Sequence, residues 1–429
     1  MSRKEFHSQK KTWFKLDNAA KIFPGQSTDT WSNIFRFSVQ LKEKVDPDLL
    51  TEALKRVLPR FPCFDVCIKK GFFWYYFEKN PNGCPDVAPD ISNPCHRVKF
   101  NENKKYLFRV YYFDNKISVD FFHALTDGRG SSFFVCTLAA EYLRLRGYDI
   151  PCGDAVLDLN EEASEEELED AFLKSAGSKG KVERSGRRVY HYRGTKMPDH
   201  RVNITSGIMS LSALKALAKS KNATVTELIE SVLLYTMYLK QKSENKAKQK
   251  EVSVQIPVDL RNMFPTHTLR NYSLTYIARL DPNLGDYTFD EVLNHVKTYL
   301  HHIHNEKYLR AMTTANLKLE NSALKYAPLI IKDLGIGLAF MITGEQTTSV
   351  LGSNLGLVKL PEEMQQYIER MYFMAGPGVL NGARCGAVGY NDTFTLTFAN
   401  IYKESDIERE FFTQLVKMGL HVKVESNRR

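Results

Sequence analysis

The stretch Ile117-Ser-Val-Asp-Phe-Phe-His-Ala-Leu-Thr-Asp-Gly128 contains the residues that decide the fold. Its first half alternates apolar and polar side chains, which predicts a strand that ends at Phe122 and pairs with residues 106–113 in a hairpin. An apolar helix is predicted over 131–146. The loop between strand and helix is anchored at both ends, and it presents His123 at the edge of a sheet.

His123 and Asp127 are the candidate catalytic residues of this loop. The pKa of imidazole lies near neutrality, so a fixed histidine can take a proton from an alcohol, an amine or a thiol. Asp127 need not touch the ring, because it can instead pair with an arginine and hold the loop. Gly128 permits a tight turn. On residue types alone, a purely structural histidine followed by a helix-capping aspartate remains open.

The whole chain has the composition of an ordinary globular protein. Of its 429 residues, 43% are hydrophobic, 25% charged and 12% aromatic, which excludes wholesale disorder, collagen-like repeats and a disulfide scaffold. No apolar run approaches the roughly 18 residues of a membrane span, and no secretory signal is predicted. The seven cysteines form no Cys-x-x-Cys pair, which indicates reduced thiols. We expect a cytoplasmic protein.

No metal site is expected. His301 and His304 lie in a helical stretch at a spacing that could suit a metal, but no further ligand is in register with them. A solvated helix face is the better interpretation of both.

The net charge of +9 does not by itself identify a partner. The densest basic patch of the chain, Lys179–Arg201, directly follows the acidic run Glu161–Asp170. We interpret the acidic run as a solvated helix and the basic patch as a linker. A basic excess also suits an anionic, phosphate-bearing cosubstrate. Nucleic-acid binding through the patch is the weakest alternative, because its charges lie in one predicted linker.

Strands and helices alternate in both halves of the chain, which predicts two α/β domains built on mixed, largely antiparallel sheets. The expected limits are residues 1–175 and 201–429, joined by a crossover linker at 176–200. Thr226 is the expected N-cap of a helix in the second half. The expected elements are strands at 35–41, 252–260 and 273–280, hairpins at 64–78, 106–122 and 383–400, and helices at 47–58, 131–146, 227–240, 290–333 and 407–420.

Phe122-His-Ala-Leu-Thr-Asp-Gly128 resembles the active-site motif of the chloramphenicol acetyltransferase-like superfamily. The resemblance extends over nearly the whole chain and is closest to bacterial alcohol acetyltransferase-like proteins. Further matching segments occur in the expected order: Arg60-Phe-Pro62, Gly71-Phe-Phe-Trp-Tyr75, Pro257-Val-Asp-Leu-Arg261, Leu269-Arg-Asn-Tyr272 and Ser353-Asn-Leu-Gly356.

The resemblance implies two like-folded domains with the active site in a tunnel between them. His123 matches the family's general base and Asp127 its structural carboxylate, for which Arg261 and Arg270 are the candidate partners. The implied reaction moves an acyl group, with acetyl as the expected one, from acyl-CoA to a hydroxyl or amine of a small acceptor. No bound cofactor is implied. Burial among apolar neighbours should lower the pKa of His123 and keep it neutral.

The same resemblance suggests residues that bind substrate. Gly128, Asn271, Ser353 and Asn354 are the candidates, with Asn271 or Asn354 as donors to the oxyanion of the tetrahedral intermediate. Each asparagine could equally be a turn or strand-end residue.

Two alternatives stay open. Peptide-condensation domains carry two adjacent histidines, and Phe122 occupies the first of those positions, which weakens a reaction with carrier-protein thioesters without excluding it. The scaffold could also serve as a non-catalytic binding or interaction module, since fold does not fix function.

Overall fold

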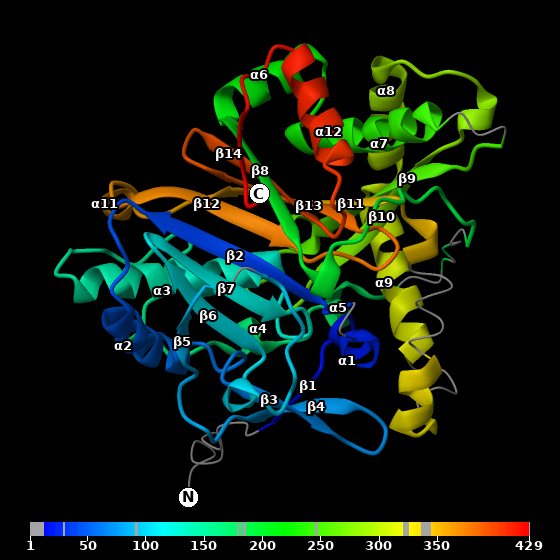
Figure 1. Ribbon diagram of the computed structural model, residues 1–429. Coiled ribbons are helices and arrows are strands. Elements are labelled where there is room, and N and C mark those ends of the chain that lie inside the picture. Colours follow the sequence, from blue (N-terminus) through cyan, green and yellow to red (C-terminus); the bar gives the residue numbers. More distant parts are fainter. Residues whose placement is uncertain are drawn as a thin grey trace, which may run out of the picture.

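A computed structural model describes residues 13–28, 31–90, 93–177, 180, 182, 186–244, 248–320, 326–335 and 345–428. Two large sheets, a small three-stranded sheet and the helices that cover them make up the fold (Figure 1). The helices are α1 (Phe23–Gln26), α2 (Pro47–Val57), α3 (Gly128–Leu145), α4 (Glu165–Leu168), α5 (Phe172–Ser175), α6 (Leu211–Ser220), α7 (Val225–Ser243), α8 (Phe289–Ile303), α9 (Glu306–Glu320), α11 (Glu362–Gln365) and α12 (Asp406–Lys417).

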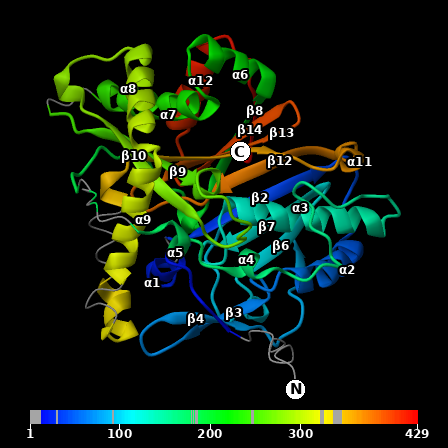
Figure 2. The same cartoon turned by 180° about the vertical axis from the view of Figure 1, so that it is seen from behind.

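The first large sheet has five strands in the order β12-β2-β7-β6-β5. Its pairs are antiparallel except β5–β6, and α3 packs on the sheet against β2 and β7 (Figure 2). The helix α3 is long and apolar, so most of its residues are buried between this sheet and α2. The strands are β12 (Ile368–Ala375), β2 (Ile34–Leu41), β7 (Lys116–Phe122), β6 (Phe108–Phe113) and β5 (Val87–Pro89).

The second large sheet has seven strands in the order β10-β9-β11-β13-β14-β8-β15. The strand β11 runs parallel to both neighbours, and the other pairs are antiparallel. Helices α6, α7 and α8 pack on it, with α12 against α7. The strands are β10 (Ser273–Leu280), β9 (Val252–Asp259), β11 (Val350–Val358), β13 (Ala383–Tyr390), β14 (Thr393–Asn400), β8 (Asn203–Ser210) and β15 (Lys423–Ser426).

The three-stranded sheet, in the order β1-β4-β3, lies at the opposite end of the molecule from α12 (Figure 1). Its strands are β1 (Trp13–Lys15), β4 (Tyr75–Lys79) and β3 (Val66–Lys70).

One strand crosses from the second half of the chain into the first sheet. The sequence analysis did not predict β12, yet β12 pairs with β2 along its whole length, with Phe373 opposite Phe37. Figure 1 shows the two side by side, orange against blue.

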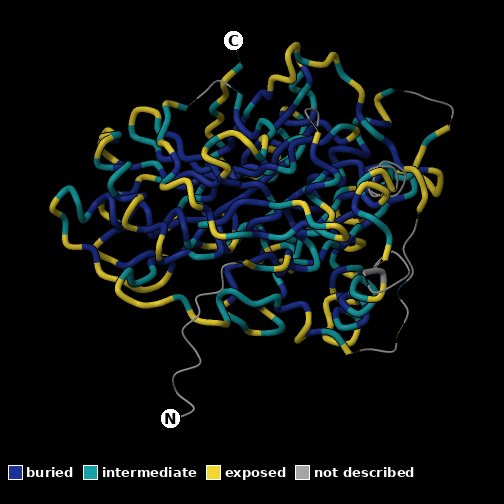
Figure 3. The backbone as a smooth tube through the Cα atoms, turned by 90° about the horizontal axis from the view of Figure 1, so that it is seen from below, coloured by how far each residue is buried: buried dark blue, intermediate teal, exposed yellow. Residues whose placement is uncertain are grey.

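Buried apolar side chains form two clusters, one under each large sheet, and buried chain runs through the centre of the molecule (Figure 3). Mixed, largely antiparallel sheets covered by helices confirm the predicted fold class. The domain limits 1–175 and 201–429 stay a prediction.

Three local predictions were wrong. The helical stretch expected over 290–333 is two helices in the described residues, α8 and α9, because the backbone leaves helical geometry at His304. The acidic run 161–170 forms a single helical turn, α4, which Ser164 caps and which ends where Glu169 takes an extended backbone. Within it, Glu167 pairs with the buried Arg60 at 2.6 Å. The N-cap of α7 is Thr224 and not Thr226, because Thr224 and Glu227 cap each other's backbone N–H groups. In the part of the chain that the structure describes, no helix is long and apolar enough to cross a membrane.

Candidate active site

The loop that carries His123 is fixed by short contacts with the segment that leads into β10. The Thr126 hydroxyl donates to the backbone oxygen of Leu269 at 2.6 Å. Gly130 lies so close to this segment that a Cβ atom there would come within 2.1 Å of the same oxygen. Glycine is therefore required at the first turn of α3, a position that the sequence motif did not mark.

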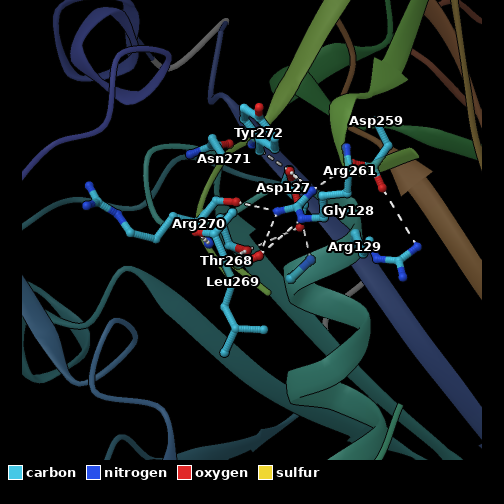
Figure 4. Close-up of polar contacts among 12 residues, drawn as sticks. Asp127, Gly128, Arg129, Asp259, Arg261, Thr268, Leu269, Arg270, Asn271 and Tyr272 are labelled. Carbon is cyan, nitrogen blue, oxygen red and sulfur yellow. Dashed lines mark hydrogen bonds and ion pairs between the residues drawn. The ribbon is translucent and has the colours of Figure 1, made fainter. Parts of the chain in front are cut away.

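Asp127 begins α3 and also binds the second half of the chain. Its Oδ1 accepts from the backbone N–H of Gly130 at 3.0 Å, which caps the helix. Its Oδ2 accepts from Arg261 Nη1 and from the backbone N–H of Tyr272, both at 2.8 Å (Figure 4). Burial would raise the pKa of Asp127, but the Arg261 guanidinium and these hydrogen bonds hold it below its ordinary value.

Of the two arginines predicted as partners of Asp127, the structure pairs it with Arg261. The Arg261 guanidinium also donates to Asp259 Oδ1 and to the backbone oxygens of Thr268 and Arg270 (Figure 4). These hydrogen bonds fix the orientation of its planar group. Arg270 instead donates to the backbone oxygen of Lys15 at 2.6 Å.

The His123 ring lies between two phenylalanines. Phe23 stacks on it at a centroid distance of 4.7 Å, and Phe35 meets it edge-on at 5.0 Å. The backbone N–H of His123 donates to the Asn33 oxygen at 2.8 Å, which fixes the start of the loop. Burial lowers the pKa of His123, so the neutral ring predominates at neutral pH.

Asn271 is the side chain that bonds the His123 ring, alongside a hydrogen bond from the ring to the backbone of His123 itself. Its Oδ1 lies 3.1 Å from His123 Nδ1, and its Nδ2 faces the backbone oxygen of Ala124. An amide oxygen only accepts, so Nδ1 is the protonated nitrogen and Nε2 retains its lone pair. Nε2 is thus the ring nitrogen that is free to accept a proton.

The other predicted substrate-binding residues are placed differently. A Cβ at Gly128 would meet the Leu355 side chain at 2.2 Å, so this turn packs directly on β11. Ser353 lies two residues before Leu355 and hence on the same face of β11. Asn354 does not reach His123: its Nδ2 donates to Thr226 Oγ1, and its Oδ1 accepts from the N–H of Gly356.

Neither asparagine is placed as an oxyanion donor. The Asn271 amide group is engaged with acceptors and that of Asn354 with Thr226. The register of β11 shifts between Asn354 and Leu357, and within this irregular stretch Asn354 accepts from the N–H of Gly356.

Residues 178–388 give a match to one protein-family model. They match the alcohol acetyltransferase family. The match lies C-terminal to the His123 loop and includes Arg261 and Asn271, which contact that loop. It supports the prediction of an acyltransferase and, with the fold, confirms the resemblance to the chloramphenicol acetyltransferase-like superfamily.

Solved structures with this fold include F. graminearum TRI101 complexed with coenzyme A and deoxynivalenol, at 11% identity and a TM-score of 0.62 over 96% of this chain and 99% of that one. The TRI3 trichothecene 15-O-acetyltransferase from Fusarium sporotrichioides is 13% identical, with a TM-score of 0.58 over 95% and 94%. Polyketide synthase associated protein 5 from Mycobacterium tuberculosis is 15% identical, with a TM-score of 0.58 over 94% and 96%. A search of curated proteins finds no match.

The remaining candidates for ligand binding have local partners. His301 lies 3.0 Å from Glu227 Oε1, and His304 Nδ1 faces the Tyr276 hydroxyl at 3.4 Å. Within the described ranges, no group of three or more His, Cys, Asp or Glu side chains could hold a metal. The basic patch 179–201 lies partly outside the described residues.

Proposed function

We propose that this protein transfers an acyl group, acetyl in the first instance, from coenzyme A to a hydroxyl or amine of a small acceptor. The observation that carries the proposal is the contact of Asn271 Oδ1 with His123 Nδ1, from which the tautomer of the ring follows. Asn271 takes the Nδ1–H, and Nε2 is left with a lone pair on a ring held between Phe23 and Phe35.

In the proposed reaction, Nε2 of His123 takes the proton from the acceptor as its oxygen or nitrogen attacks the thioester carbonyl. The tetrahedral intermediate then collapses, the carbon–sulfur bond breaks, and the same proton passes from Nε2 to the leaving thiolate of coenzyme A. Asp127 contributes by holding the loop to Arg261 and does not contact the ring. Ser353 stays the candidate for a direct contact with substrate.

Coenzyme A as the acyl donor is proposed from the family match and the charge of the chain, and not from contacts in the site. The family match supports acyl transfer, and the net charge of +9 is compatible with the anionic phosphates of coenzyme A. The tunnel between the two halves and the cytoplasmic location stay predictions.

The test is thioester cleavage. Purified protein is given acetyl-CoA with a panel of primary alcohols and amines, and release of the free thiol is followed. His123→Ala should lower kcat/KM by roughly a hundred- to ten-thousand-fold, since a positioned base is lost. His421→Ala, which removes an exposed histidine between α12 and β15, is the matched control and should be unchanged.

Equal rates for wild type and His123→Ala would overturn the mechanism. If neither wild type nor His123→Ala releases thiol from acetyl-CoA with any acceptor of the panel, the result would favour the non-catalytic scaffold. Activity only with a carrier-protein thioester would favour the condensation reaction.

A further inference from the structure

We infer that Asp17 is a positioning residue of this site: through Asn271, it fixes the tautomer of His123. The inference rests on the proposed role of His123 as a base. Asp17 lies near the N-terminus, far from the His123 loop in sequence, and no motif of the chain marks it.

Asp17 is fully buried, with 0% of its surface exposed, and each of its oxygens has a donor. Oδ1 accepts from the backbone N–H of Ala20 at 2.7 Å, at the start of a short 3₁₀ turn over Ala20–Ile22. Oδ2 accepts from Asn271 Nδ2 at 3.2 Å. The carboxyl group therefore joins the N-terminal segment to the amide that faces His123.

The orientation of the Asn271 amide follows from its neighbours. Its two N–H groups face Asp17 Oδ2 and the backbone oxygen of Ala124, which are both acceptors. Its oxygen must then face His123 Nδ1, which becomes the donor. The Asp17 carboxyl, the Asn271 amide and the His123 imidazole thus form a chain of hydrogen bonds in which each donor faces an acceptor.

An isosteric substitution reverses this set. In Asp17→Asn, the side-chain oxygen is needed by the Ala20 N–H, so the new NH₂ group takes the place of Oδ2. It would face the NH₂ of Asn271, and two donors cannot pair. Rotation of the Asn271 amide removes this conflict at the cost of its long hydrogen bond to the Ala124 oxygen, 3.5 Å, and turns its NH₂ toward His123 Nδ1. That nitrogen must then accept, and the proton moves to Nε2.

Four charged or titratable groups influence Asp17. Burial raises its pKa, the Arg270 cation 3.7 Å from Oδ2 lowers it, and Asp127 raises it. Asp170 and His123 also interact with it electrostatically. A proton on Oδ2 would have the same effect as the asparagine, because it turns the acceptor of the Asn271 N–H into a donor.

The experiment is nitrogen-15 NMR of protein labelled at histidine, in which long-range couplings identify the protonated ring nitrogen of His123 at pH 8. The resonances are assigned with His123→Ala. Wild type should show Nδ1–H, and Asp17→Asn should show Nε2–H or a mixture of both tautomers. With acetyl-CoA and the alcohol panel, Asp17→Asn should lower kcat/KM roughly ten- to a hundred-fold.

Asp46→Asn is the matched control. Asp46 caps α2 by accepting backbone N–H groups, much as Asp17 accepts the N–H of Ala20, and asparagine is an equally good helix cap. This variant should leave the His123 tautomer unchanged.

An Nε2–H ring in wild type overturns the inference without any variant, and so does an unchanged tautomer in Asp17→Asn. A changed tautomer with an unchanged rate supports the role of Asp17 but contradicts His123 as the base, so the two failures can be told apart. If Asp17→Asn does not fold, Asn271→Ala tests the same connection, since the Nδ1 proton then loses its acceptor and the ring should become a tautomer mixture.

Discussion

Asp127 and Glu230 are both buried carboxyl groups, and their surroundings have opposite effects on their charge. Asp127, 5% exposed, has an arginine and two backbone N–H groups around it. Glu230, 1% exposed in the middle of α7, packs on the bare backbone of Gly352, and within the described part of the chain its Oε2 has no hydrogen-bond partner. Burial raises the pKa of Glu230 to about 8.

The comparison teaches that burial alone does not decide the state of a carboxyl group. Where partners converge, as at Asp127, the charge is retained and its pKa falls. Where they do not, as at Glu230, the neutral acid is the stable form at neutral pH. Only the first arrangement holds the His123 loop in place, and the two groups should affect stability over different ranges of pH.

The largest expected effect is on stability in Asp127→Asn. Loss of the carboxylate leaves the Arg261 guanidinium buried with only Asp259 as an anion, which should cost about 3 kcal/mol of the free energy of unfolding. Urea denaturation at pH 7 measures this loss. Because the pKa of Asp127 is lowered, its contribution is complete above the unfolded pKa of about 3.9 and disappears as pH falls through the folded value.

Asp120→Asn is the control for that variant. It breaks another buried pair, between Asp120 and Arg36, on β7 but outside the loop. We expect similar destabilisation by both variants, and a lower kcat in the folded protein for Asp127→Asn alone. Equal activity in both would mean that the Arg261 pair does not position His123.

The next variant should raise the free energy of unfolding instead of lowering it. Glu230→Gln should stabilise the protein by about 3 kcal/mol at pH 7, because wild type must keep a proton that the unfolded chain has released. The sign follows from the raised pKa: stability of wild type falls from about pH 5 to about pH 8 and then levels off, and the variant lacks this decline.

Thermal or urea unfolding across this range measures the difference, with Glu363→Gln, at an exposed glutamate, as the matched control. A wild-type curve parallel to that of Glu230→Gln would show that Glu230 is already charged, and the contrast with Asp127 would be lost.

The smallest effect concerns the contact between α7 and β11. Gly352→Ala would bring a Cβ within 2.3 Å of Glu230 Oε2 and should cost about 1–3 kcal/mol through overpacking. Combining it with Glu230→Ala should recover part of that cost. A double-mutant cycle measures the recovery, and strictly additive free energies would contradict this packing.

Local patterns carried most of what could be predicted from the sequence. The hairpin, the His123 loop and its helix follow from alternation, turn residues and apolar spacing, and Arg261 lay in a matching segment. Asp17 and β12 were missed because their partners are hundreds of residues away, and a pairing at that distance leaves no periodic pattern in the chain. The contacts of Asn354 with Thr226 and Gly356 lie at a register shift that no periodic pattern of the sequence marks.

The crossing of β12 has a consequence for synthesis. Leu41 completes β2 early, but the strand that covers its outer edge, Ile368–Ala375, is translated near the end of the chain. A nascent chain that ends near residue 200 therefore has an open sheet edge, the kind of surface that recruits other chains into aggregates. The first half should consequently need the second for solubility during translation, and the ribosome must release almost the entire polypeptide before the first sheet can close.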